Sequence, residues 1–195
     1  MRTEVGRLIL VRHGESEGNR DRRFTSSATV PLTVLGREQA RVAARRIKAQ
    51  FQPELVIASP FVRARQTAEI IASELALSTE IDDDFHEQSL GELAGQSYDA
   101  MREHPEYDLL RYWEWRAPAG ESLQEVRERT GPALDRIAAK SAGRQIIIVS
   151  HGGVMASLWA HVTGRWEAAR IPPNAGIVIV ERHDGRYAKP WVLRE

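Results

Sequence analysis

The feature that most constrains the fold is an apolar run at residues 8–11 that ends directly at Arg12-His13-Gly14. Four consecutive apolar residues are typical of a short strand that is buried on both faces of a sheet. In open α/β sheets, ligands bind at the carboxyl ends of the strands. The run therefore predicts a buried strand whose end holds a guanidinium and an imidazole at a ligand site. A surface Arg-His pair at a strand end is the alternative interpretation.

The pairing of Arg12 with His13 indicates chemistry on an anion. The guanidinium of Arg12 offers a planar fork of donors that suits phosphate oxygens. The imidazole of His13 is a nucleophile when one ring nitrogen is unprotonated. A neighbouring guanidinium favours that state, because a like charge disfavours the imidazolium.

A second apolar run, at residues 55–58, ends at Ser59-Pro60 and is followed by a helical pattern. Arg63 falls in the first turn of this expected helix, where a cation is unfavourable with respect to the helix dipole. The placement is explained if an anion binds at the helix N-terminus, where free N–H groups also point. An exposed arginine is the alternative.

A third apolar run, at residues 146–149, ends at the Ser-His-Gly-Gly segment of residues 150–153 and also precedes a helical pattern. A single histidine at such a position is often structural, whereas His151 paired with His13 indicates a shared site. Gly152 and its neighbour allow backbone N–H groups to approach an oxyanion. Sheet geometry brings strand ends together, so we expect these motifs to converge.

Apolar strands that alternate with helical patterns predict an α/β fold. Two strands are expected near the C-terminus, at residues 177–180 and 187–192, and Asp184-Gly185 between them indicates a tight antiparallel hairpin. Pro190 places the last strand at a sheet edge. With a short edge strand near Ile81, the sheet is expected to have six strands.

The composition sets limits on size and partners. A length of 195 residues predicts one domain over residues 1–195. Lys plus Arg and Asp plus Glu number 27 each, so no overall charge favours nucleic acid or a membrane. The chain has no Cys, which excludes disulfides, thiolate metal sites and Cys nucleophiles. Without a leader-like segment or a long apolar run, we expect a cytoplasmic protein with no nucleic-acid or membrane partner.

The motifs together resemble the histidine phosphatase superfamily, the phosphoglycerate-mutase-like proteins. Glu87 also matches that family's pattern, in which a Glu is followed by Gly four and eight residues later. The segments that carry the resemblance are Arg12-His13-Gly14 with Glu15, Ser16 and Asn19; Ser59-Pro60 with Arg63-Ala64 and Gln66-Thr67-Ala68; Glu87 with Gly91 and Gly95; and Ser150-His151-Gly152-Gly153.

The resemblance implies covalent phosphoryl transfer, in which His13 attacks phosphorus and becomes a phosphohistidine. It implies that Glu87 protonates the leaving oxygen and then acts as the base toward water. The groups implied to surround the phosphoryl oxygens, where charge must be stabilised, are Arg12, Asn19, Arg63, His151 and Gly152.

The resemblance also implies a three-layer α/β/α sandwich around a mixed, mostly parallel sheet, and it implies no metal or other cofactor. A metal site built on His86 and Glu87 is the alternative, and it lacks further ligands at informative spacing.

Residues 97–119 interrupt the α/β pattern and are rich in Tyr and Trp. We interpret them as an inserted helical lobe that is too short for a core of its own. In the family such an insertion covers the active site, whereas the aromatic residues can equally serve to attach the lobe. Arg111 and Arg116 are candidates for binding a second anionic group. Trp166, with the terminal hairpin, is a candidate for a homodimer interface.

The expected activity is that of a phosphatase on small phosphomonoesters, such as sugar phosphates, phosphoglycerates or nucleoside-type phosphates. The mutases of this family are usually longer and carry a Trp before the motif Asn, where this chain has Gly18 before Asn19. A phosphoglycerate mutase and a non-catalytic phosphate-binding or interaction module are the alternatives.

Overall fold

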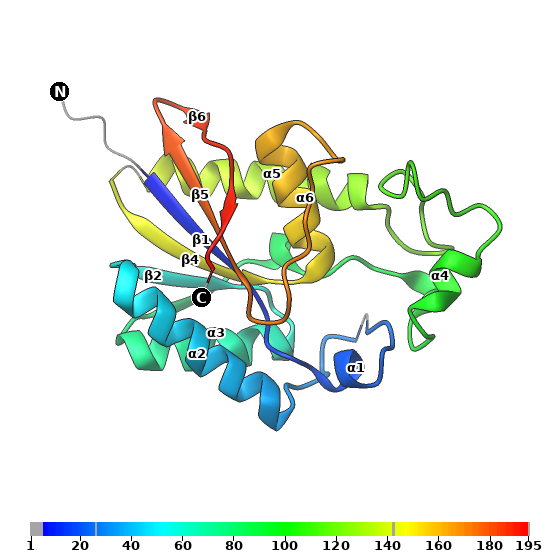
Figure 1. Cartoon of the computed structure of the whole chain (residues 1–195), viewed down its shortest axis with the longest axis horizontal. Helices are drawn as coiled ribbons and strands as arrows, with labels where there is room; N and C mark the ends of the chain where they lie inside the picture. The colour runs from blue at the N-terminus through cyan, green and yellow to red at the C-terminus, as the bar shows by residue number, and fades with distance from the viewer. Residues whose placement is uncertain (1–5, 26, 142, 195) are drawn as a thin grey trace.

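A seven-stranded sheet lies at the centre of the protein, seen in a computed structural model that describes residues 6–25, 27–141 and 143–194 (Figure 1). The sheet runs in the order β3-β2-β4-β1-β5-β6, and β7 pairs with β5. The strands are β1 (Gly6–Arg12), β2 (Leu55–Ala58), β3 (Thr79–Ile81), β4 (Gln145–Ser150), β5 (Ile177–His183), β6 (Arg186–Tyr187) and β7 (Trp191–Val192). The first four strands in this order are parallel, and β5, β6 and β7 join them by antiparallel pairs.

The parallel register brings the predicted strand ends together. Val11 of β1 lies opposite Val149 of β4, and Val149 lies opposite Ala58 of β2. The residues that follow these three positions therefore leave the sheet side by side. In Figure 1 this edge faces α1 (Glu17–Arg20) and α4 (Asp99–Glu103).

Helices cover both faces of the sheet, which confirms the predicted three-layer α/β/α fold (Figure 1). Four helices form the outer layers: α2 (Val34–Gln50) and α3 (Val62–Leu75) on one face, α5 (Leu123–Lys140) and α6 (Gly152–Thr163) on the other. Alternate residues of β1 point to opposite faces, as a strand requires. Ile9 packs in the core beneath α2 and α3, whereas Leu10 packs in the core beneath α5 and α6. The strand is buried on both faces, as its unbroken apolar run predicts.

The sheet has seven strands where the sequence predicts six, because the last predicted strand is split. β6 and β7 both pair with β5, and the residues between them make no ladder. Pro190 lies in that gap, and a proline has no N–H to donate to a ladder. The hairpin before it is as predicted, since Asp184 and Gly185 both have positive φ, 48° and 80°.

The segment at residues 97–119 contains one helix, α4, and otherwise turns and irregular structure. Two short 3₁₀ helices, η1 (Asp83–Phe85) and η2 (Gly91–Leu93), precede it. Its aromatic residues separate into two groups. Trp115 packs in a small core with Leu90 and Leu93, whereas Trp113 stacks on Trp166 with ring centroids 5.9 Å apart.

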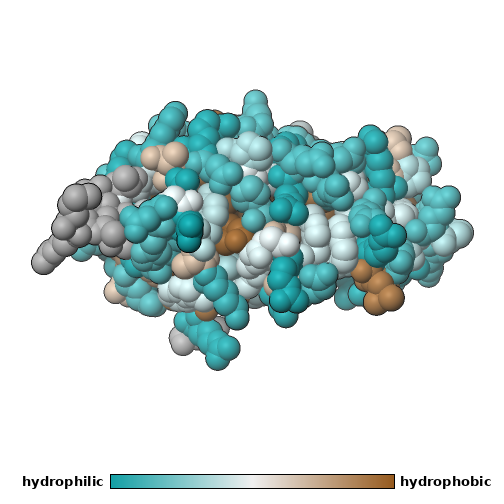
Figure 2. Space-filling model, turned by 90° about the horizontal axis from the view of Figure 1, so that it is seen from above, coloured by the Kyte–Doolittle hydropathy of each residue, from teal (hydrophilic) through white to brown (hydrophobic). Residues whose placement is uncertain are grey.

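The face of the molecule in Figure 2 is mostly hydrophilic, with small, separate apolar areas. Within the described part of the chain, no helix has the length and apolar character that crossing a membrane requires.

Candidate active site

A cavity of about 300 Å³ opens at the carboxyl ends of β1 and β4. Six residues proposed from the sequence line it: Arg12, His13, Asn19, Arg63, Glu87 and Gly152. A second set of lining residues, which we call the apolar wall, is Phe24, Leu90, Tyr98, Met101, Tyr107, Tyr112, Leu123 and Ile171. The cavity therefore combines a charged group of residues with a largely apolar side.

His13 is held with one ring nitrogen available for attack. The residue is 3% exposed, and its backbone N–H donates to the carbonyl of Ser150 on β4. Its Nδ1 lies 2.7 Å from the carbonyl oxygen of Gly14. A carbonyl only accepts, so Nδ1 carries the ring proton and Nε2 keeps its lone pair. Nε2 faces Arg63, whose Nε donates to it at 3.3 Å.

The protonation state of His13 agrees with this geometry. Burial holds the pKa of His13 well below its ordinary value, and the positive charges of Arg63 and Arg12 lower it further. The hydrogen bond to Gly14 acts in the opposite direction. At neutral pH the ring is therefore a neutral imidazole, the form that can attack an electrophile.

Arg63 is a buried cation at the start of α3, which confirms the predicted position and excludes the exposed alternative. It is 1% exposed, and its Nη atoms donate to the carbonyls of Ser27 and Thr25. The guanidinium also lies over the ring of Phe61, 5.1 Å from its centroid. Burial lowers the pKa of Arg63, although an arginine remains charged in proteins.

Arg12 is the second cation of the site and keeps a donor unused. Its Nη1 donates to the carbonyl of Pro172 at 2.9 Å. Its Nε is buried without a hydrogen-bond partner among the described residues. A buried donor left unpaired costs about 1–3 kcal/mol, so a bound anion that accepted from it would be strongly favoured.

His151 lies behind His13 rather than on the cavity surface. It is fully buried, and the two ring centroids are 5.1 Å apart. Its Nε2 lies 2.7 Å from the hydroxyl of Ser59, which also accepts from the N–H of Phe61. Either atom of this pair can be the donor, depending on the tautomer of His151, and Nδ1 of His151 has no partner in the described structure. Burial, followed by the charge of Arg63, keeps the pKa of His151 well below its ordinary value.

Glu87 enters the cavity from the segment between η1 and η2. Its Oε1 accepts from the N–H of Gln88 at 2.9 Å. The carboxyl packs against Gly153 of α6, where an added Cβ would lie only 2.8 Å from Oε1. Glycine at this position therefore leaves the room that the carboxyl occupies.

Gly14 is required by a close approach of two backbone segments. An added Cβ would lie 2.2 Å from the carbonyl oxygen of Gly36 at the start of α2. The chain after β1 thus passes directly against that helix, while the N–H of Gly14 donates to the hydroxyl of Thr67 on α3.

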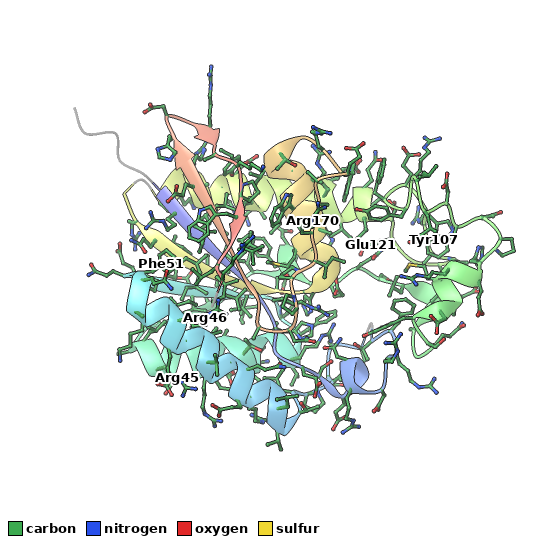
Figure 3. All side chains as sticks on the ribbon, in the orientation of Figure 1. Arg45, Arg46, Phe51, Tyr107, Glu121 and Arg170 are labelled. Carbon is green, nitrogen blue, oxygen red and sulfur yellow. The ribbon has the colours of Figure 1, made fainter. Side chains whose placement is uncertain are left out.

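Several residues that support the site carry no sequence signal that predicts this role. Asn174 donates to the carbonyl of His13 and to Oδ1 of Asn19, and only its place after two prolines distinguishes it in the sequence. Arg129 of α5 donates to the carbonyl of Glu87 and pairs with Glu121 at 3.0 Å. Figure 3 shows Glu121 near the end of the molecule that carries Tyr107.

Arg111 and Arg116, considered from the sequence as candidates for a second anion, do not line the cavity. Arg111 pairs with Glu114, and Arg116 pairs with Glu125 at 3.2 Å. Arg23 is instead the further cation among the lining residues described. Trp166 is 8% exposed against Trp113, so it offers little surface to a partner. Among the residues described, no three His, Asp or Glu gather as a metal site would require.

The model of the histidine phosphatase superfamily (branch 1) matches this chain over residues 8–192. The chain belongs to that superfamily. The match extends from β1 to β7 and so includes every residue proposed for the site. The family that the sequence motifs resemble is thereby confirmed.

Relatives of this histidine phosphatase have both mutase and phosphatase names. Phosphoglycerate mutase-like protein 4 of Arabidopsis thaliana is 34% identical, covering 93% of this chain and 82% of the relative. A probable phosphoglycerate mutase GpmB of Shigella boydii is 32% identical, covering 95% and 90%. The native structure of mycobacterial glucosyl-3-phosphoglycerate phosphatase superposes with a TM-score of 0.83 at 26% identity, covering 94% of this chain and 96% of that one. These findings support an enzyme of the phosphatase or mutase type.

Proposed function

We propose that this histidine phosphatase is a phosphomonoesterase that acts on small phosphorylated metabolites through a phosphohistidine at His13. The observation that carries the proposal is the state of this residue. Its Nδ1 donates to Gly14, and its unprotonated Nε2 accepts a hydrogen bond of 3.3 Å from Nε of Arg63, which a bound phosphoryl group would replace. A neutral imidazole in a cavity that two arginines also line is suited to attack a phosphorus atom that carries anionic oxygens.

The proposed reaction has two steps. First, Nε2 of His13 bonds to phosphorus, the ester P–O bond breaks, and the proton of Glu87 passes to the leaving oxygen. Second, Glu87 takes a proton from water, whose oxygen attacks phosphorus and releases phosphate from His13. Arg12 and Arg63 stabilise the charge on the phosphoryl oxygens throughout.

Three further groups are proposed to hold the phosphoryl group. Nδ1 of His151 is buried without a partner in the described structure and lies next to His13; we propose that Ser59 donates to Nε2, which leaves the proton on Nδ1 for a phosphoryl oxygen. The N–H of Gly152 belongs to the first turn of α6, where backbone donors are free to bind an anion. Asn19 lines the same cavity, and its Nδ2 has a second N–H besides the one that donates to Tyr98.

The apolar wall favours a leaving group with apolar surface. Among the substrate classes considered from the sequence, nucleoside-type phosphates have an aromatic base that offers such apolar surface. Phosphoglycerates carry a carboxylate instead. A carboxylate would need a cation of its own. Arg23 is the available candidate, and one of its Nη atoms already donates to the carbonyl of Gly95.

Phosphoglycerate mutase activity is the second candidate, and the names of the curated relatives favour it. The chemistry is the same as far as the phosphohistidine. The two activities then differ in whether water or a sugar-acid hydroxyl receives the phosphoryl group.

The test is phosphate release from a panel of aryl, nucleoside, sugar and phosphoglycerate monoesters without added metal, with His13→Ala in parallel. We expect release by the wild type and a loss of at least several orders of magnitude in the variant. Interconversion of phosphoglycerate isomers without phosphate release would establish the mutase instead. Phosphate binding without turnover on any substrate would favour the non-catalytic module.

The remaining expectations stay predictions: a single domain, a cytoplasmic location, independence of metals, no nucleic-acid or membrane partner, and a homodimer. For the homodimer, the exposed side chains of Trp191 and Val192 on β7 are the surface that the terminal strands offer.

A further inference from the structure

Tyr98 is an aromatic residue at the start of α4 whose hydroxyl has one hydrogen-bonding function unused. The ring lines the cavity and packs against Phe24 with centroids 4.9 Å apart. Its backbone is fixed, because the N–H of Tyr98 donates to the carbonyl of Arg22 at 3.1 Å. The hydroxyl is therefore held at a defined place on the border between the apolar wall and the charged residues.

The orientation of the Asn19 amide determines what the Tyr98 hydroxyl can do. Three donors converge on Oδ1 of Asn19: the N–H and the hydroxyl of Ser16, at 3.1 and 3.0 Å, and Nδ2 of Asn174 at 3.0 Å. Only a carbonyl oxygen can accept from three donors, so this atom is the amide oxygen of Asn19. The amide nitrogen is therefore fixed on the side of the group that faces away from Ser16 and Asn174.

That amide nitrogen donates to the Tyr98 hydroxyl at 3.0 Å. An amide nitrogen cannot accept, so the Tyr98 oxygen is the acceptor and its own proton must point elsewhere. No group among the described residues accepts that proton. The phenol lines the same cavity as Arg12 and Arg63.

We propose that the Tyr98 hydroxyl donates a hydrogen bond to a non-bridging oxygen of the phosphoryl group held between Arg12 and Arg63. Tyr98 then acts as a phosphate-binding residue. The hydrogen bonds of Ser16 and Asn174 fix the Asn19 amide, and the Asn19 amide in turn fixes the direction in which the Tyr98 hydroxyl can donate. The inference rests on the proposed function in one respect only, namely that the cavity binds a phosphoryl group.

The test is the variant Tyr98→Phe, which removes the hydroxyl and keeps the ring. A hydrogen bond to a charged group makes binding about 10- to 100-fold tighter. We therefore expect kcat/KM for p-nitrophenyl phosphate to fall by that factor and the dissociation constant of inorganic phosphate, measured by calorimetry, to rise by about 10-fold. Values within twofold of the wild type in both measurements would overturn the proposal.

Tyr187→Phe, on β6, is the matched control, because it also removes a hydrogen-bonded tyrosine hydroxyl. The hydroxyl of Tyr187 donates to Asp135 of α5 at 2.6 Å. It should leave both measurements unchanged at a temperature where the variant is folded. If the wild type bound phosphate but turned over no ester, the proposed function would fail, while the difference in phosphate binding would still decide the role of Tyr98.

A double-mutant cycle separates direct binding from an effect through Asn19. If the Tyr98 hydroxyl only positioned Asn19, then Tyr98→Phe would have no further effect on phosphate binding in an Asn19→Ala background. Direct donation to the phosphoryl group predicts that Tyr98→Phe still weakens binding in that background.

Discussion

At the scale of single residues, the surroundings of His13 prepare it for the role of nucleophile that we propose. One carbonyl, that of Gly14, selects the tautomer of His13, and buried guanidinium charge keeps the ring neutral. The same burial lowers the free energy of unfolding at acidic pH. Below about pH 6.5, the ordinary pKa of histidine, the imidazole of His13 binds a proton in the unfolded chain but stays neutral in the folded protein.

The sign of this pH dependence follows from the lowered pKa of His13. Above about pH 6.5 neither state binds the proton and the group contributes nothing to the pH dependence. Below it the unfolded state binds more protons, so stability falls as the pH falls, by up to about 1.4 kcal/mol per pH unit. Urea unfolding between pH 7 and pH 5.5 should therefore show a steeper loss for the wild type than for His13→Asn. Equal slopes would contradict the assigned pKa direction.

Gly153 allows a second test on a single residue. In Gly153→Ala the new methyl group meets the Glu87 carboxyl at 2.8 Å and should displace it. A misplaced catalytic group costs on the order of 100-fold in kcat/KM.

Gly164→Ala, at the other end of α6, is the control for the Gly153 variant. Gly164 has φ +70° and nothing within 4 Å of an added Cβ. This variant should lose about 1 kcal/mol of stability and keep its activity. Full kcat/KM in the Gly153 variant would contradict the proposed role of the Glu87 carboxyl.

At the scale of elements, the segment that carries Glu87 depends on α5. Arg129 donates to the carbonyls of Asp84 and Glu87 and pairs with Glu121, and both side chains of that pair are largely buried. The Glu87 carboxyl, the proposed proton donor, therefore lies on irregular backbone that a helix fixes in place.

We expect Arg129→Met to lower kcat/KM by at least 10-fold, with a smaller change in KM, because the proton donor loses its alignment. Arg136→Met is the matched control on the same helix. Arg136 pairs with Asp82 and Asp84 through an exposed side chain, so its loss should change stability by less than about 1 kcal/mol and leave turnover intact. Equal kinetics for the two variants would exclude the positioning role of Arg129.

Some of the elements that form the site are predictable from the sequence, and others are not. The ends of β1, β2 and β4 are predictable because an apolar run and the residue that stops it are local signals, and parallel pairing then aligns them. The contributions of Asn174 and Arg129 depend on the path of loops and on the rotation of a helix, which no local pattern records. The split of the last strand follows from Pro190, but the pairing of both halves with β5 does not.

At the scale of the whole molecule, the site combines the sheet edge with the segment at residues 97–119. That segment is attached to the domain through Trp166, on which Trp113 stacks and to whose carbonyl the Tyr112 hydroxyl donates. Because Tyr112 also belongs to the apolar wall, the attachment should determine how well a leaving group is held.

Trp166→Ala tests this attachment. We expect a higher KM for aryl and nucleoside monoesters, with a smaller effect on esters of small alcohols, because only large leaving groups reach the apolar wall. Trp191→Ala, on the exposed strand β7, should change neither. A uniform change in KM across the panel would show that the attachment does not act on the leaving group.

The central claim is that His13 carries the phosphoryl group during turnover, and rapid quenching with a ³²P-labelled monoester tests it most directly. We expect an acid-labile label on the peptide that contains His13, formed before phosphate is released and absent from His13→Asn. Turnover by the wild type without a label on His13, or with the label on another residue, would contradict it.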